Sequence, residues 1–246
     1  MAVAAVYDRR VLLVVRSAVT DRRYRAFTLI ELLVVIVIIS VLAGLAFPVF
    51  QSVQNSAKKT QAKNDVTQIV TAVNAFYTEY GKYPTTAPTT TDTFFGATTD
   101  AVPSGAAAAG QNDLVLDVLR NNTAGSNGPS VTALNPRGIA FLELRAINNS
   151  SAPKAGVVAN GGSGAGRAGV FYDPWGSEYR ILIDTTYDNS LNNPYTDTPG
   201  GTNISTGVAV WSVGKNGTLG GGATGAGTEP GSVNTYRSSG DVISWQ

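Results

Sequence analysis

The chain has 246 residues and a formal net charge of +1, and it contains neither cysteine nor histidine. Their absence excludes disulfides, thiolate nucleophiles, Cys/His zinc sites and every catalytic triad that uses imidazole as its base. Residues 1–26 carry six arginines and two aspartates, a charge of +4, whereas the rest of the chain carries 12 basic and 15 acidic side chains, a charge of −3. A mildly acidic body has no basic footprint for duplex DNA, so no nucleic-acid partner is predicted.

A long apolar segment follows the basic stretch. Residues 32–50 include no charged side chain, and a helix of this length spans about 28 Å, close to the roughly 30 Å hydrocarbon core of a bilayer. Arg22, Arg23 and Arg25 precede it, so the positive-inside rule predicts a single-pass protein with a cytoplasmic N-terminus. The apolar run is longer than that of a secretory signal peptide and has no A-x-A-like site behind it. An ordinary signal anchor remains the simplest alternative.

The helical pattern continues beyond Phe50 but becomes amphipathic. Its apolar stripe consists of Val66, Ile69, Val70, Val73, Phe76, Tyr77 and Tyr80. Gly81 supplies a C-cap and Pro84 prevents the helix from resuming. We therefore predict a helix over 27–80, transmembrane at about 29–50 and amphipathic at about 51–80, followed by a globular head over 81–246.

The first half of the head is expected to be poor in regular structure. Thr85–Gly110 is rich in Thr, Ala, Gly and Pro and is predicted to be an irregular loop. Asp113–Asn121 suits a short helix with Asn112 or Asp113 as its N-cap. Residues 139–147 could form a strand or a short helix, because their periodicity does not decide between them.

The second half of the head contains the β signals. Ala159–Gly169 is predicted to be a Gly-rich linker or hairpin tip. Three runs are predicted strands: Tyr179–Ile183, Val208–Val213 and Asp241–Trp245. Turn-rich stretches separate them, which favours a small antiparallel sheet packed on the long helix, an α+β fold.

Glu31 is a carboxylate near the start of the apolar helix, where a charge costs up to about 2.5–3.5 kcal/mol. Alone it could be an interfacial side chain that reaches water. Its context, Arg25-Ala-Phe-Thr-Leu-Ile-Glu-Leu-Leu33, resembles the processing signature of type IV pilins and type II secretion pseudopilins, with Ala26 where that family usually has Gly. The resemblance implies a leader, residues 1–26, that prepilin peptidase cuts off between Ala26 and Phe27. It also implies N-methylation of Phe27 and pairing of the new ammonium with Glu31 in the same or a neighbouring subunit, which offsets both burials.

Pro48 lies inside the apolar helix, where it removes an amide donor and crowds the carbonyl of Gly44. A simple kink would be ordinary in a membrane helix. The pilin resemblance implies more: the helix between Gly44 and Pro48 unwinds locally when it is packed in a filament.

Four segments of the head resemble the major pseudopilin of type II secretion. They are residues 79–86 (EYGKYPTT), 173–176 (DPWG), 211–217 (WSVGKNG) and 240–245 (GDVISW). This resemblance implies a pilin-like fold and a homopolymer filament, the pseudopilus, that grows from the inner membrane with minor pseudopilins and an assembly platform as partners. Residues 87–169 and the insertion at 184–207 are not explained by it. A minor pilin of a type IV pilus, serving adhesion, motility or DNA uptake, is the alternative.

The family resemblance also implies a calcium site in the loop between the last two strands. Only Asp241 carries over cleanly, with Asn216 as a weaker oxygen donor where the family tends to have Asp, and Glu229 is the only other acid between them. Calcium takes six to eight oxygens, usually with several carboxylates. A Gly-rich hairpin without metal is the competing interpretation.

No catalytic base is visible in the sequence, so no enzymatic activity is predicted. The glycines at 160–166 lack the Gly-Lys-Ser/Thr of a phosphate-binding loop. Asp184, Asp188 and Asp197 lie among turn residues and are expected to be solvated. The three tryptophans could stack on sugars, as in an anchored carbohydrate-binding module, but packing in the sheet core is favoured. They are Trp175, Trp211 and Trp245.

Overall fold

The computed structural model describes residues 28–87, 90–97, 102–159, 166–195, 201–221, 236 and 239–245. The predicted cleavage site at Ala26 and Phe27 lies outside these residues, as do Asp197 and Glu229. The chain divides into two compact units, residues 1–50 and 51–246, and each is described by itself.

The first unit contains the start of helix α1 (Leu29–Tyr80), whose bounds agree with the predicted helix. Its large apolar side chains from Leu29 to Leu45 are all exposed, with exposed fractions between 45% and 80%. A window of α1 is long and apolar enough to cross a membrane. The backbone stays helical through Gly44 and Pro48. Unwinding between these two residues stays a prediction for the assembled state.

In the second unit, the C-terminal half of α1 carries one buried stripe. Val66, Ile69, Val73 and Phe76 are fully buried, at the spacing expected of a single apolar face. The helix ends as predicted, because Gly81 takes a left-handed φ of +65° and its N–H donates to the carbonyl of Tyr77 at 2.8 Å.

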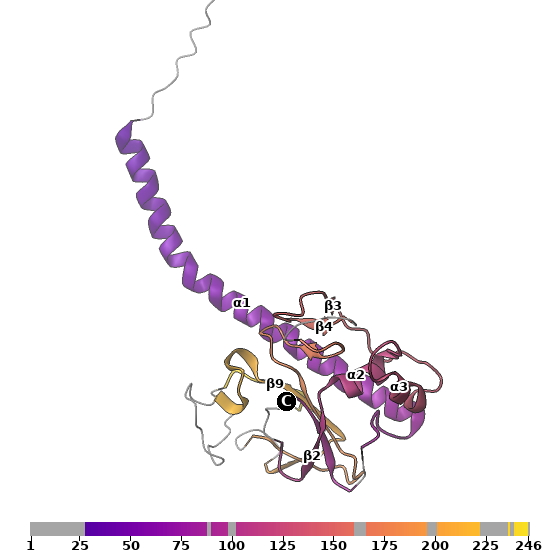
Figure 1. Ribbon diagram of the computed structural model, residues 1–246. Coiled ribbons are helices and arrows are strands. Elements are labelled where there is room, and N and C mark those ends of the chain that lie inside the picture. Colours follow the sequence, from indigo (N-terminus) through magenta and orange to yellow (C-terminus); the bar gives the residue numbers. More distant parts are fainter. Residues whose placement is uncertain are drawn as a thin grey trace, which may run out of the picture. The chain divides into compact units, whose positions relative to one another are not determined.

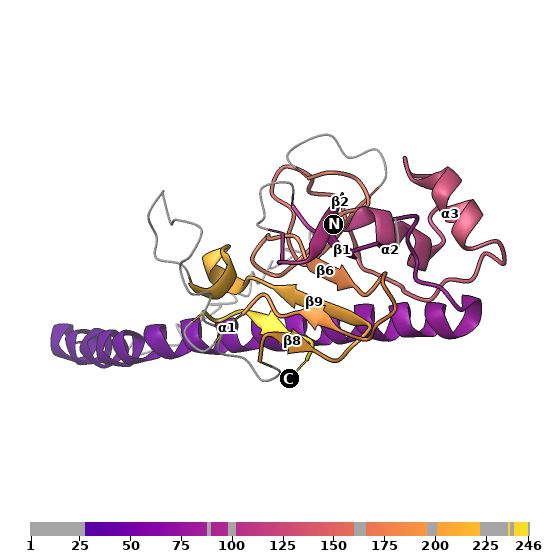
Figure 2. The ribbon, with the colours of Figure 1, turned by 90° about the horizontal axis from the view of Figure 1, so that it is seen from below.

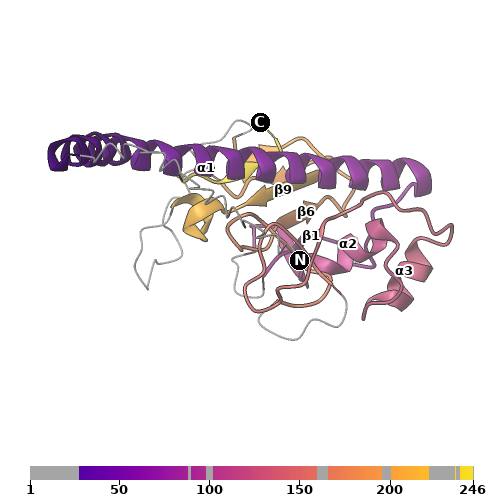
Figure 3. The same ribbon diagram turned by 90° about the horizontal axis from the view of Figure 1, so that it is seen from above.

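A five-stranded sheet lies beside this half of α1 (Figures 1 and 3). Its strands are β1 (Asp92–Phe95), β2 (Ala106–Gly110), β6 (Arg180–Ile183), β9 (Val208–Ser212) and β10 (Val242–Ile243). They follow the order β10-β9-β6-β1-β2. All neighbours are antiparallel except β1 and β2, which are parallel. The fold is α+β, with a long N-terminal helix and a sheet rich in antiparallel pairs, as the pilin-like prediction required.

Both faces of the sheet are buried, and strands β6 and β9 accordingly carry apolar residues on both faces, with Arg180 and Ser212 as their polar positions. Ile181, Ile183, Val208 and Val210 join the stripe of α1 in one core cluster. Alternate residues face the other way because side-chain direction has a period of two. Leu182, Ala209 and Trp211 thus belong to a second cluster. The paired strands that carry them, β6 and β9, are labelled in Figure 2.

Shorter elements complete the head. They are α2 (Asp113–Arg120), α3 (Gly128–Leu134), β3 (Ala146–Ile147), β4 (Gly156–Val158), β5 (Phe171–Tyr172), β7 (Leu191–Asn192), β8 (Asn203–Ile204) and the 3-10 turns η1 (Gly214–Asn216) and η2 (Leu219–Gly221). Strands β4 and β5 are consecutive and antiparallel, which confirms a hairpin around the Gly-rich stretch. The strands predicted near the C-terminus are present as β6, β9 and β10, shortened by one to three residues.

The prediction of an irregular loop over Thr85–Gly110 was wrong, because this segment supplies β1 and β2. Phe94 and Phe95 are both buried, one in each core cluster, so no alternation is visible in the sequence. The alanines of β2 have low strand propensity, and pairing with β1 decides their conformation.

Two other predictions for this half are resolved. Helix α2 forms where expected and Asn112 stands at its N-cap, but its side chain makes no capping hydrogen bond. The side-chain nitrogen Nδ2 of Asn112 instead donates to the backbone carbonyls of Phe171 and Tyr179, at 3.0 and 2.9 Å. Residues 139–147 are neither a helix nor a full strand, since only Ala146–Ile147 pairs with β4.

Candidate functional site

The first candidate site is the N-terminal end of α1. The Glu31 carboxylate oxygen Oε2 accepts hydrogen bonds from the Thr28 backbone N–H at 2.8 Å and from its hydroxyl at 2.6 Å. The Glu31 N–H lies 3.3 Å from the Thr28 hydroxyl oxygen and donates to it. This is a capping box, in which two residues satisfy each other's groups at the first turn. Glu31 therefore has partners inside its own subunit before any assembly occurs.

Sequence reasoning missed the capping box, although the Thr-x-x-Glu spacing was the signal for it. Glu31 was weighed only as an interfacial side chain or as the partner of an ammonium at Phe27. The structure adds a local partner, and nothing in it tests the pairing between subunits. Because Thr28 follows Phe27 directly, a new N-terminus at Phe27 would lie beside the same carboxylate.

The apolar residues after Glu31 form a surface whose exposure to water is unfavourable. Every large side chain from Leu32 to Leu42 is about half exposed or more. At about 25 cal/mol per Å² of apolar area, covering such a helix with lipid or with other helices is strongly favourable. A contiguous apolar surface of this size marks a membrane or assembly contact.

Comparison with family models decides what this end of the chain is. Residues 21–47 match the model described as the prokaryotic N-terminal methylation motif. The chain carries a prepilin-type N-terminus. The motif supports a type IV pilin-like or pseudopilin subunit that prepilin peptidase processes, and together with the apolar helix it indicates membrane anchoring. Comparison with curated proteins and with solved structures gave no match.

The second candidate feature is the Asp173–Gly176 turn of the head. The Asp173 oxygen Oδ1 accepts three backbone N–H bonds, from Trp175, Gly176 and Ser177 at 2.8–2.9 Å. Its other oxygen accepts a bond from the Ser212 hydroxyl of β9 at 2.6 Å. Gly176 has a φ of +105°, a conformation that glycine adopts without strain. The carboxylate thus joins the turn to the sheet, which is a structural role.

Buried carboxylates recur through the head. The Tyr179 hydroxyl donates to Asp65 of α1 at 2.7 Å and ties the helix to the sheet. Burial raises the pKa of Asp65 and of Asp173, although hydrogen bonds partly oppose the effect. Burial likewise raises the pKa values of Asp92, Asp113 and Asp241. These groups favour their protonated forms more in the folded head than in the unfolded chain.

The raised pKa values predict that mild acid stabilises the head. The folded head binds more protons than the unfolded chain between the ordinary aspartate pKa, 3.8, and the raised folded values. The free energy of unfolding therefore increases as the pH falls from 7 into this window, and it stops increasing below it. Urea melts of residues 51–246 at pH 7, 6, 5 and 4 measure this. A steady decrease of the unfolding midpoint over this range would contradict it.

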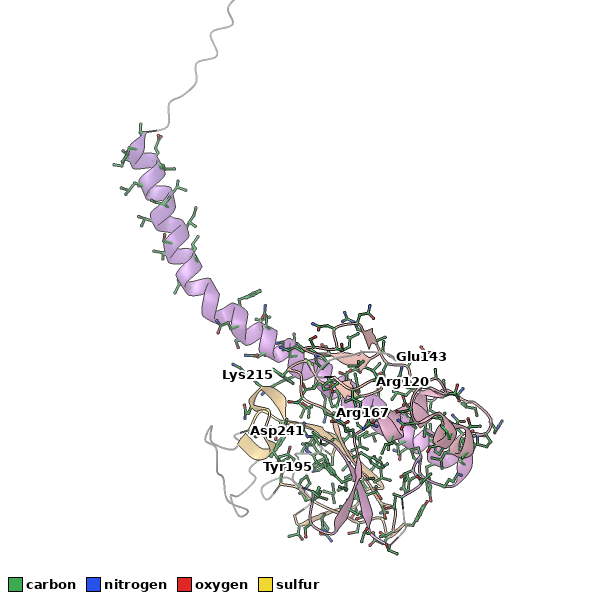
Figure 4. All side chains as sticks on the ribbon, in the orientation of Figure 1. Arg120, Glu143, Arg167, Tyr195, Lys215 and Asp241 are labelled. Atoms are coloured by element: carbon green, nitrogen blue, oxygen red, sulfur yellow. The ribbon has the colours of Figure 1, made fainter. Side chains whose placement is uncertain are left out.

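The two predicted calcium ligands, Asp241 and Asn216, are linked by hydrogen bonds through Ser239. Asp241 Oδ2 accepts bonds from the Tyr195 hydroxyl at 2.7 Å and from the Gly220 N–H at 2.9 Å, and Tyr195 and Asp241 lie together in Figure 4. The Asn216 amide donates to the carbonyl of Ser239 at 2.6 Å, and the Ser239 hydroxyl accepts from the Asp241 N–H. The other oxygen of Asp241 is buried without a hydrogen-bond partner among the described residues.

The donor set for calcium is incomplete in the part of the chain that the structure describes. No three acidic side chains there come together in a way that could hold a metal ion. Asp241 offers one buried oxygen, and the hydrogen bond from Asn216 to Ser239 uses the side-chain nitrogen of Asn216. Further oxygen ligands would have to be carbonyls of the loop after Asn216, of which residues 222–235 lie outside the described residues.

The three tryptophans differ in their surroundings. Trp211 is 2% exposed and stacks on Phe94, with ring centroids 5.8 Å apart. Trp245 meets the edge of Trp211 and is half-buried. Trp175, in the Asp173 turn, is also half-buried. Packing in the sheet core is confirmed for Trp211, which offers no ring face to a sugar.

Proposed function

We propose that this protein is a structural subunit of a type II secretion pseudopilus. Prepilin peptidase removes residues 1–26, the N-terminus remains on the cytoplasmic side of the inner membrane, and α1 then leaves the lipid to form the filament core. The subunit acts by assembling with copies of itself, with minor pseudopilins and on an inner-membrane platform, and it performs no catalysis. Pseudopilus growth helps to move folded proteins across the outer membrane.

One observation carries this proposal: a methylation motif leads directly into a helix whose apolar side chains are exposed on all sides from Leu29 to Leu45. A helix that is apolar all round needs a fully apolar environment, and both lipid and a bundle of identical helices supply one. The head motifs that resemble a major pseudopilin favour secretion over a pilus. The helix cap at Gly81, the turn at Gly176 and the strand of Trp211 have conformations that fit these motifs.

The main alternative is a minor pilin, which a separate lobe at residues 87–169 would have favoured. The described part of this segment does not form a separate lobe. Strand β1 pairs with β6 in the middle of the sheet, and α2 contributes Val115, Leu116 and Leu119 to the core shared with α1. Neighbouring genes for an outer-membrane secretin and a secretion ATPase would favour the pseudopilus, and a gene for a retraction ATPase would favour the pilus.

Processing is the direct test of the proposal. In cells with an active prepilin peptidase, intact-mass measurement of the membrane fraction is expected to find a chain that starts at N-methylated Phe27. The matched control is a strain without the peptidase, in which residues 1–26 are retained. Full-length chain in both strains would overturn the proposed function.

We also propose a weak calcium site at Asp241, with Asn216 and carbonyls of the following loop as further oxygen donors. A cation would supply the missing partner of the buried Asp241 oxygen. With one carboxylate we expect a Kd near 10⁻⁴–10⁻³ M, so millimolar calcium adds roughly 1 kcal/mol. This raises the melting temperature of residues 51–246 by about 2–4 °C over the chelated protein. Asp241→Asn is expected to remove the difference, and superimposable melts with calcium and with chelator would disprove the site.

A further inference from the structure

Two surface features of the head have complementary chemistry, and Asp241 is the one residue in them that already has a proposed role. The first, the tyrosine cluster, consists of Tyr77, Tyr83 and Tyr187 near the C-terminal end of α1. The second, the lysine pocket, lies nearer the middle of α1. It is lined by Lys59, Thr60, Lys63, Asn64, Thr67, Tyr236, Asp241, Val242 and Ile243.

The rings of the tyrosine cluster lie against one another. Tyr83 stacks on Tyr187 with centroids 5.3 Å apart and packs against Tyr77 in a tilted arrangement at 4.8 Å. Tyr83 is buried, whereas Tyr77 is 39% and Tyr187 is 46% exposed. The head thus presents two aromatic rings to the outside, supported from behind by a third.

The turn that carries Tyr187 is held in a costly conformation. Tyr187 has a φ of +62° and Asn189 one of +57°, the left-handed region, which asparagine tolerates and a residue such as tyrosine seldom adopts. Asp184 was expected to be solvated but is 2% exposed. Its carboxylate fixes the turn by accepting bonds from the N–H groups of Asp188 and Asn189 at 3.3 and 2.7 Å. Residues kept in such conformations concentrate at functional sites.

The surroundings of Tyr187 are acidic. The Thr186 hydroxyl lies within hydrogen-bond distance of both Asp184, at 2.9 Å, and Asp92, at 3.1 Å. Asp188 is exposed next to Tyr187 in the chain. Aromatic faces beside carboxylates attract ammonium and guanidinium groups, through the ring quadrupole and through charge.

The lysine pocket offers such groups. It is an open groove with about 730 Å³ of space, enough for an aromatic side chain and its neighbour. Lys59 is exposed, and the ammonium of Lys63 is held at the pocket by a 2.7 Å bond to the carbonyl of Ile243.

We propose that Tyr187 and Asp188 of one copy of this chain dock into the lysine pocket of another copy. The two features cannot meet within one chain, because Lys59 and Tyr77 are 18 residues apart on one helix, roughly 27 Å. A contact between two different patches is heterologous and, where it does not close, propagates into a filament. This inference rests on the proposed function and adds the contact that sets the offset of neighbouring heads. It predicts a displacement of about 20–27 Å along α1 between contacting copies.

Photo-cross-linking tests the contact without removing the aromatic ring. Tyr187 is replaced by p-benzoylphenylalanine in the full chain, in cells that assemble the filament. Irradiation is expected to give dimers whose cross-link maps, by mass spectrometry, to residues 59–67 of the second copy. The matched control places the same residue at Val102, which is 40% exposed, and is expected to give no dimers through residues 59–67. Cross-links from position 187 only to lipid, glycan, another protein or another region of the chain would overturn the proposal.

Charge reversal provides the second test. Lys59→Glu and Asp188→Lys are each expected to reduce the amount of filament about fivefold or more, and the double variant is expected to recover most of it. Asp188→Asn retains a side-chain acceptor for the Ser190 N–H, the bond that Asp188 makes at 2.9 Å, and serves as the control for the fold of the turn. Melting temperatures within 2 °C of wild type would show that the heads are folded. Single variants that assemble normally, or a double variant as defective as the singles, would refute the contact.

A wrong docking contact and a wrong proposed function give different experimental results. If wild-type chain is processed and forms filaments but position 187 does not cross-link to residues 59–67, the docking contact is wrong and the filament function stands. If wild-type chain forms no filament in the presence of a complete assembly system, the proposed function itself is wrong.

Discussion

Replacing Glu31 with leucine is expected to reduce filament assembly at least tenfold while the chain still inserts in the membrane. Insertion becomes easier, by at most about 2.5–3.5 kcal/mol, because a charge is removed from the apolar segment. Assembly fails because the ammonium of processed Phe27 would enter the filament core without a counter-charge. Leaving one partner of a buried ion pair alone costs about 3–5 kcal/mol, which is more than a factor of 100 in an association constant.

The capping box supplies the controls for this experiment. Glu31→Gln retains an acceptor for Thr28 but not the charge, and it is expected to fail like leucine. Thr28→Val removes the hydroxyl that bonds Glu31 at 2.6 Å and retains the charge, and it is expected to assemble within a few-fold of wild type. Filaments are counted by electron microscopy and membrane insertion by carbonate extraction. Normal filament numbers from Glu31→Gln would show that the carboxylate acts only as a helix cap.

Replacing Trp211 with alanine is expected to destabilise the head by about 3–5 kcal/mol, the usual cost of deleting a large buried aromatic side chain. Trp211 fills the space between Phe94 on β1 and Trp245 after β10, with centroid distances of 5.8 and 6.1 Å. Its loss leaves a cavity in the core cluster on the side of the sheet away from the buried stripe of α1.

Thermal melting of residues 51–246 measures this effect, which corresponds to a decrease of about 6–20 °C. Val102→Ala is the control at an exposed apolar position and is expected to change stability by less than about 0.5 kcal/mol. A Trp211→Ala head that melts within 2 °C of wild type would contradict the packing role. Such a result would reopen the interpretation of Trp211 as a surface for stacking.

The sequence by itself determined the elements whose hydrogen bonds are local. Helix α1 begins at Leu29, within two residues of the predicted start, and ends at Tyr80 as predicted, because its backbone hydrogen bonds and the cap from Gly81 to Tyr77 join residues four apart. Strands β6 and β9 were also predicted, since both runs are rich in β-branched isoleucine and valine, which have high strand propensity. The methylation motif was visible because the chemistry requires contiguous residues.

Only the tertiary structure decided which distant residues meet. Strands β1 and β2 exist because β6 offers a paired edge, and Asn112 became a bridge between Phe171 and Tyr179 when β5 came within reach of its amide. Tyr179 meets Asp65, 114 residues away, and Tyr195 meets Asp241, 46 residues away. Pairings of this kind are fixed by the shape of a shared core, which no local pattern encodes, because the loop-closure entropy is recovered only when the whole core forms.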